Sequence, residues 1–187
     1  ERKIYAWSKD VPKPERPGVQ LGTVMRMFGD NTVKAFAAGG IALPSAHAKA
    51  LSTPQTPDIV AFINLARSYQ ALYLGDGDDA AKKKASLEFA RKAVNIWPGY
   101  QIARRMYAWL LWQTGSPDKA RLHFQEALKC EEAAAKQWQC VPNDVRSLVA
   151  LGRIDLAADQ TEAARQALAA AAKLRPGDPA VQYWLGA

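Results

Sequence analysis

The stretch QIARRMYAWLLWQTGSPDKARLHFQEALKCEEAA, the 34 residues from Gln101 to Ala134, decides the fold. Its apolar residues recur at spacings of three and four in two blocks, which Gly115 and Pro117 separate. This pattern predicts two amphipathic helices joined by a short turn. Helices joined so closely are expected to run antiparallel.

The same arrangement occurs twice more along the chain. FINLARSYQALYL precedes LEFARKAVNIWP, which ends at Pro98, and SLVALGRIDLAAD precedes ARQALAAAAKLRP, which ends at Pro176. A single hairpin of this kind cannot bury its apolar face, so neighbouring hairpins must stack. The chain is therefore predicted to be all-α, an α-solenoid of antiparallel helix pairs.

The spacing of large and small residues resembles the tetratricopeptide repeat, whose helices carry L-G-x2-Y and then A-x3-F-x2-A. In the middle repeat, residues 101–134, Tyr107, Ala108 and Leu111 occupy the first motif, and Phe124 belongs to the second. The third repeat, residues 145–178, has Gly152 at the small position.

The resemblance also covers a less regular first repeat and the beginning of a fourth. In the first, residues 58–100, Leu65, Ala66 and Tyr69 fit the first motif, and YLGDGDDAAKKK is expected to form a longer turn. A fourth repeat begins at Pro179. It either caps the solenoid or continues in a longer protein, and its shortness favours the second alternative.

Residues 1–57 form a different region, because they hold six of the eleven prolines and show no repeat register. LGTVMRMFGD and NTVKAFAAGG are predicted to be short helices that either pack on the first repeat or form a degenerate repeat of their own. The chain begins with Glu1 rather than Met, as expected of a mature product or a fragment.

The chain is basic, with a net charge of +7, and this balance suggests acidic partners. Its densest run, Lys82 to Lys84, directly follows acidic residues and is expected to be a solvated surface. No apolar stretch reaches the 18 residues of a membrane span, so anchoring would have to come from segments absent from this chain. Nucleic acid is not a predicted partner, because no dense basic stripe is present.

Cys130 and Cys140 stand ten residues apart and are either a disulfide or two free thiols. A disulfide would pin the inserted residues 135–144 between two repeats, and it would require an oxidising compartment. A periplasmic or other extracytoplasmic location is favoured on this ground. A zinc site from His123 and the two cysteines would lack a fourth ligand, so no metal is predicted.

No catalytic constellation stands out in the sequence. The two histidines, His47 and His123, have no partner that the spacing identifies, and neither a phosphate-binding loop nor a G-x-S-x-G motif occurs. The chain is predicted to be no enzyme and to need no cofactor.

The resemblance implies that the first helix of each repeat lines a concave face that holds ligands. Carrying its ligand positions over residue by residue selects a row of arginines, aromatic residues and glutamines without an acid: Arg67, Gln70, Arg105, Trp109, Trp112, Gln113, Arg146, Arg153 and Tyr183. Arginine forks suit carboxylates, and tryptophan faces suit aromatic, aliphatic or sugar-ring contacts. The alternative is that Trp109 and Trp112 are covered and belong to the core.

The resulting hypothesis is a non-catalytic scaffold or adaptor that binds an acidic or C-terminal segment of a partner protein. Its predicted setting is a bacterial envelope assembly or polysaccharide secretion system. Anionic polysaccharide is the second candidate ligand. The alternative function is a carbohydrate-binding or regulatory module of a larger polysaccharide-processing enzyme.

Overall fold

The computed structural model describes residues 30–40, 42, 44, 45, 49, 58–130 and 140–186. The chain divides into two compact units, residues 1–59 and 60–187. In the first unit, residues 30–38 are helical. The proline-rich lead-in and the predicted helix LGTVMRMFGD, apart from its last residue Asp30, lie outside the described residues.

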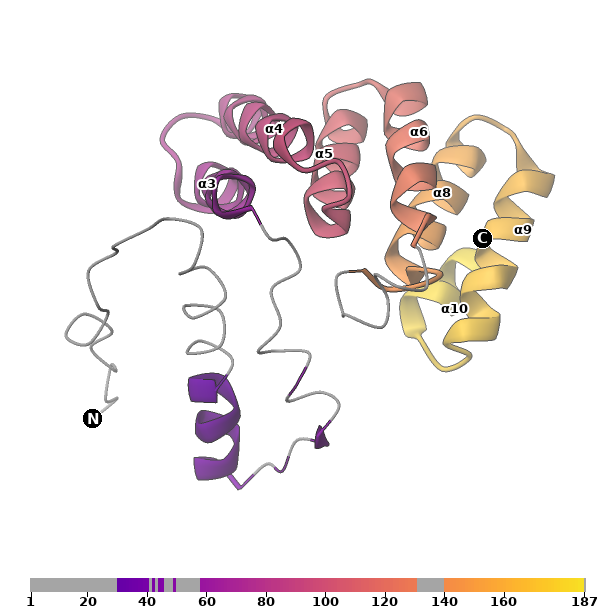
Figure 1. The fold of residues 1–187 in the computed structure, drawn as a ribbon. Coiled ribbons are helices and arrows are strands. Elements are labelled where there is room, and N and C mark those ends of the chain that lie inside the picture. Colours follow the sequence, from indigo (N-terminus) through magenta and orange to yellow (C-terminus); the bar gives the residue numbers. More distant parts are fainter. Residues whose placement is uncertain are drawn as a thin grey trace. The chain divides into compact units, whose positions relative to one another are not determined.

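The second unit is a succession of helix pairs, which follow one another in chain order in Figure 1. The helices are α3 (Ile59–Leu74), α4 (Asp79–Ile96), α5 (Gln101–Gln113), α6 (Pro117–Leu128), α8 (Val145–Ala157), α9 (Thr161–Leu174) and α10 (Pro179–Leu185). No strand occurs in the described parts of the chain. The all-α fold of stacked hairpins is therefore confirmed. None of the helices described is long and apolar enough to cross a membrane.

The turns within the hairpins are short and use left-handed backbone. Gly115 ends the turn after α5 with φ 82°, and Asp159 holds the equivalent place after α8 with φ 57°. The long turn expected from YLGDGDDAAKKK is wrong. Only residues 75–78 connect α3 to α4, since the side chain of Asp78 accepts a hydrogen bond from the Ala81 N–H and starts α4 early. The extra residues lengthen the two helices instead, and the lysine run lies within α4.

Small residues let the two helices of a hairpin approach closely. In the third hairpin, a Cβ added to Gly152 would lie 2.5 Å from Leu168 Cγ. In the first hairpin, Ser68 Oγ donates to the Ser86 backbone carbonyl at 2.9 Å, and both serines are fully buried. Ala66, by contrast, is exposed. The register predicted for the first repeat is therefore two residues too early, because Ser68 takes the small position.

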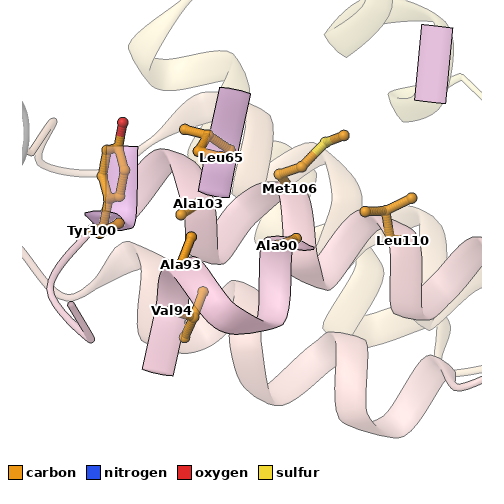
Figure 2. Packing of buried hydrophobic residues seen from close by; sticks show 9 residues of the cluster. Leu65, Ala90, Ala93, Val94, Tyr100, Ala103, Met106 and Leu110 are labelled. Carbon is orange, nitrogen blue, oxygen red and sulfur yellow. The ribbon is translucent and has the colours of Figure 1, made fainter. Parts of the chain in front are cut away.

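Two apolar clusters form the core between the hairpins. The first joins α3, α4 and α5, and Figure 2 shows its members Leu65, Ala90, Ala93, Val94, Tyr100, Ala103, Met106 and Leu110. The second joins α5, α6 and α8 through Ala108, Leu111, Ala120, Phe124, Leu151 and Ile154. Burial raises the pKa of Tyr100 to about 12. Each cluster draws on successive hairpins, as stacking requires.

Candidate functional site

Three side chains from the first helices of successive repeats form a stack. The guanidinium carbon Cζ of Arg153, on α8, lies 4.7 Å from the ring centroid of Trp112 on α5. The same atom lies 4.6 Å from the ring of Trp184 on α10. Tyr183 meets the Trp184 ring edge-on at 5.0 Å. We call Trp112, Arg153 and Trp184 the Trp–Arg–Trp stack.

The stack holds its arginine by aromatic faces rather than by a counter-ion. No carboxylate is recorded against the Arg153 guanidinium among the described residues, and its buried Nε has no hydrogen-bond partner there. Indole faces attract a guanidinium through the ring quadrupole and leave its N–H edge for another acceptor. Within the described residues, Arg153 is therefore held by aromatic rings and is not paired with a carboxylate.

Arg105, by contrast, is already paired within the chain. Its Nη1 donates to Asp144 Oδ1 at 3.1 Å, and the two side chains are only 18% and 9% exposed. The other carboxylate oxygen of Asp144 accepts from the backbone N–H of Ser147 and so caps α8. The prediction of a wall without an acid is wrong at this position, because the N-cap of the next first helix supplies one.

Trp109 is largely a core residue. It packs against both apolar clusters, while Trp112 packs against the second cluster and also against Arg153. The two tryptophans therefore differ in whether they line the first-helix face or belong to the core. Trp109 fills the space between hairpins, and Trp112 reaches the stack.

The remaining predicted positions are exposed but dispersed. Arg67 and Gln70 on α3, Gln113 at the end of α5 and Arg146 at the start of α8 all lie at the surface. Within the described residues, no hydrogen bond, ion pair or ring contact joins these four side chains to the Trp–Arg–Trp stack. The register predicted for the first repeat begins at Ile59, which is two residues too early. The ligand positions that it assigns to Arg67 and Gln70 are therefore displaced by two residues.

The junction between the second and third repeats is fixed by several polar contacts and a disulfide. Cys130 and Cys140 are bonded, with their Cα atoms 5.8 Å apart. The Gln101 side chain donates to the Ala127 carbonyl at 2.7 Å, and it exchanges two hydrogen bonds with the backbone of Val141. α6 stops at Leu128 rather than running on as a longer helix. These contacts hold the start of α8, and with it Asp144, against α5.

His123 and Asp155 both make structural contacts with other described residues. The His123 ring packs edge-on against Tyr107 at 4.7 Å, and burial, followed by the charge of Arg104, lowers its pKa. Oδ1 of Asp155 lies 2.6 Å from Nη2 of Arg121, with which it forms an ion pair. Burial nevertheless raises the Asp155 pKa, because desolvation outweighs the arginine's charge.

Trp184 is the site residue that the sequence did not reveal. It stands at the repeat position of Met106, whose side chain packs with residues of the preceding hairpin. Such a position points back at the preceding first helix, and for α10 that helix is α8, which carries Arg153. A tryptophan where the other repeats have Met106 and Ala150 was the available signal.

No family model matches this sequence, and no curated protein does. Among solved structures, the chain is similar to the first TPR of Spaghetti (RPAP3) bound to the HSP90 peptide SRMEEVD, with 12% identity and a TM-score of 0.55. The match covers 68% of this chain and 88% of that chain. The resemblance read from the repeats is thus confirmed at the level of architecture: the chain has a tetratricopeptide-like fold.

Proposed function

We propose that this protein is a non-catalytic scaffold whose first-helix face binds an extended, acidic segment of a partner protein. The Trp–Arg–Trp stack carries this proposal. A guanidinium already ordered between two rings loses little conformational freedom on binding, so more of the interaction energy appears as affinity. Its fork matches the two oxygens of a carboxylate. The peptide bound by the similar RPAP3 domain supports a peptide as the class of ligand.

The proposed setting is outside the cytoplasm, in a bacterial envelope assembly or polysaccharide secretion system. The Cys130–Cys140 disulfide supports an oxidising compartment. The second candidate is a module that binds anionic polysaccharide for a larger enzyme. It is favoured by the two indole rings of the stack, since aromatic faces also suit sugar rings.

A titration followed by NMR tests the proposal and separates its two forms. The probes are an amidated decapeptide of glycine and serine with one glutamate, the same peptide with glutamine, and an oligosaccharide that contains glucuronate. The readouts are the indole N–H signals of Trp112 and Trp184. We expect the glutamate peptide to shift both signals and the glutamine peptide to bind about tenfold more weakly or worse, as loss of a charged hydrogen bond implies.

Substitution of the stacked arginine provides the matched control. Arg153→Gln is expected to weaken binding of the glutamate peptide about tenfold or more, since it removes the charged donor. Arg175→Gln makes the same change in charge at an exposed position after α9 and should alter the affinity less than twofold. Equal affinity of Arg153→Gln and the unaltered protein would refute the peptide site. Selective binding of the glucuronate probe would favour the second candidate.

A further inference from the structure

Arg105 and Arg153 lie on the same face, but they differ in what surrounds their guanidinium groups. Arg105 donates to a nearly buried carboxylate, whereas Arg153 lies between two rings with no carboxylate recorded against it in the described chain. An approaching anion would have to compete with Asp144 for Arg105. Asp144 is not easily displaced, because its other oxygen accepts from the Ser147 N–H and hydroxyl at 3.1 and 2.6 Å.

We infer that Asp144 is a specificity-determining residue: as a built-in counter-ion to Arg105, it keeps this arginine from receiving a second acidic group beside the one at Arg153. This inference rests on the proposed function and specifies which of these two arginines can bind an acidic group. With Asp144 in place, the pair Arg105 and Arg153 offers one position for a carboxylate. Without its charge, Arg105 would become a second position.

The helix geometry gives the distance between the two positions. Arg105 and Trp112 are seven residues apart on α5, which corresponds to two turns and about 10 Å along the axis. Arg153 stacks directly on Trp112. An extended peptide advances about 3.3 Å per residue, so about three residues span this interval. A face with both arginines open should therefore prefer two acidic residues spaced three apart.

The anchored junction explains why the counter-ion stays in place. Gln101 binds the backbone of Val141 in both directions, and the Cys130–Cys140 disulfide lies next to that contact. Asp144 follows three residues later and begins α8 as its N-cap. The same few residues thus position the helix that carries Arg153 and neutralise Arg105.

The test compares the whole protein with Asp144→Asn, which removes the charge and keeps a side chain that caps helices well. The probes are three amidated decapeptides of glycine and serine. One has a single glutamate, one has two glutamates three residues apart, and one has two glutamates six residues apart. The indole N–H signals of Trp112 and Trp184 report binding. The unaltered protein is expected to bind all three peptides with affinities that differ less than about threefold.

In Asp144→Asn, the peptide with the three-residue spacing should bind about three- to fivefold more tightly than the single-glutamate peptide, as one added ion pair of up to about 1 kcal/mol implies. The six-residue spacing should bring no such gain. Adding Arg105→Gln to Asp144→Asn should remove the gain. Asp144→Ser, a second capping residue without charge, should behave like Asp144→Asn and guards against a folding defect of one variant.

Each outcome decides the inference. No gain in Asp144→Asn and Asp144→Ser, a gain that survives Arg105→Gln, or an equal preference for the three-residue spacing in the unaltered protein would overturn it. These results leave binding by the unaltered protein intact. Failure of the unaltered protein to bind any of the peptides would instead refute the proposed function, and the inference with it.

Discussion

Gly152 is the position where one added methyl group should disturb the fold most clearly. In Gly152→Ala, the new Cβ would lie 2.5 Å from Leu168 Cγ and 2.8 Å from Leu168 Cδ2. Ordinary carbon contacts begin near 3.5 Å, so α8 and α9 would have to separate by roughly 1 Å. Leu168 is only 2% exposed, so its side chain cannot turn outward into solvent without losing its burial. Such overpacking costs about 1–3 kcal/mol, while alanine regains about 1 kcal/mol of helix propensity.

We therefore expect Gly152→Ala to lower the free energy of unfolding by up to about 2 kcal/mol, which corresponds to as much as roughly 8 °C in melting temperature. Urea unfolding followed by circular dichroism measures this change. A double-mutant cycle with Leu168→Ala supplies the control. The leucine truncation alone leaves a cavity, and the added methyl should then cost less, with a coupling of about 1 kcal/mol. A Gly152→Ala protein as stable as the parent, with no coupling to Leu168→Ala, would refute the close approach of α8 and α9.

Three further predictions concern stability. Asp159→Gly should stabilise the protein by about 0.5–1 kcal/mol, because glycine adopts the left-handed backbone of this position freely, and urea midpoints measure the gain. Replacing Cys130 and Cys140 by serine should lower the free energy of unfolding by about 2–3 kcal/mol, because the disulfide no longer restricts a loop of ten residues in the unfolded chain. When reductant is added to the parent protein, its melting temperature should therefore fall to that of the serine variant. The pKa of His123 is lowered in the folded protein, so as pH falls through the ordinary value of 6.5 this histidine takes up a proton in the unfolded chain before it does so in the folded one. Its contribution is thus present above that value and lost below it, so the stability difference between pH 7.5 and 5.5 should shrink in His123→Gln.

The sequence predicted the parts of the fold that depend on local signals. Helices begin at Gln101, Val145 and Pro179, where the repeat pattern placed the starts. The three-to-four periodicity and the Gly and Pro stops act over a few residues, so they can be read without the tertiary structure. The first repeat was misplaced because Ala66 and Ser68 are both small. The contact between Ser68 and Ser86, 18 residues away, distinguishes them only in the folded chain.

The candidate site was predicted less completely, because its decisive contacts join residues far apart in the sequence. Arg153 and Trp112 were selected from their repeat positions, but their mutual stacking depends on how α5 and α8 lie side by side. The partner of Arg105 is 39 residues away and precedes the helix it caps. A reading restricted to helix positions therefore could not include Asp144.

The net charge of the chain overstates how many unpaired cationic side chains it can offer a ligand. The chain carries +7, yet Arg105 is paired with Asp144, and Arg121 lies against the carboxylate of Asp155. Paired guanidinium groups contribute little to the binding of an added anion, because the anion must compete with a carboxylate held in place by the fold. Arg153 differs because aromatic rings order it without neutralising it. Under the proposed function, selectivity follows from which arginines the chain leaves unneutralised, and so the charge of Asp144 should matter as much as that of the arginines.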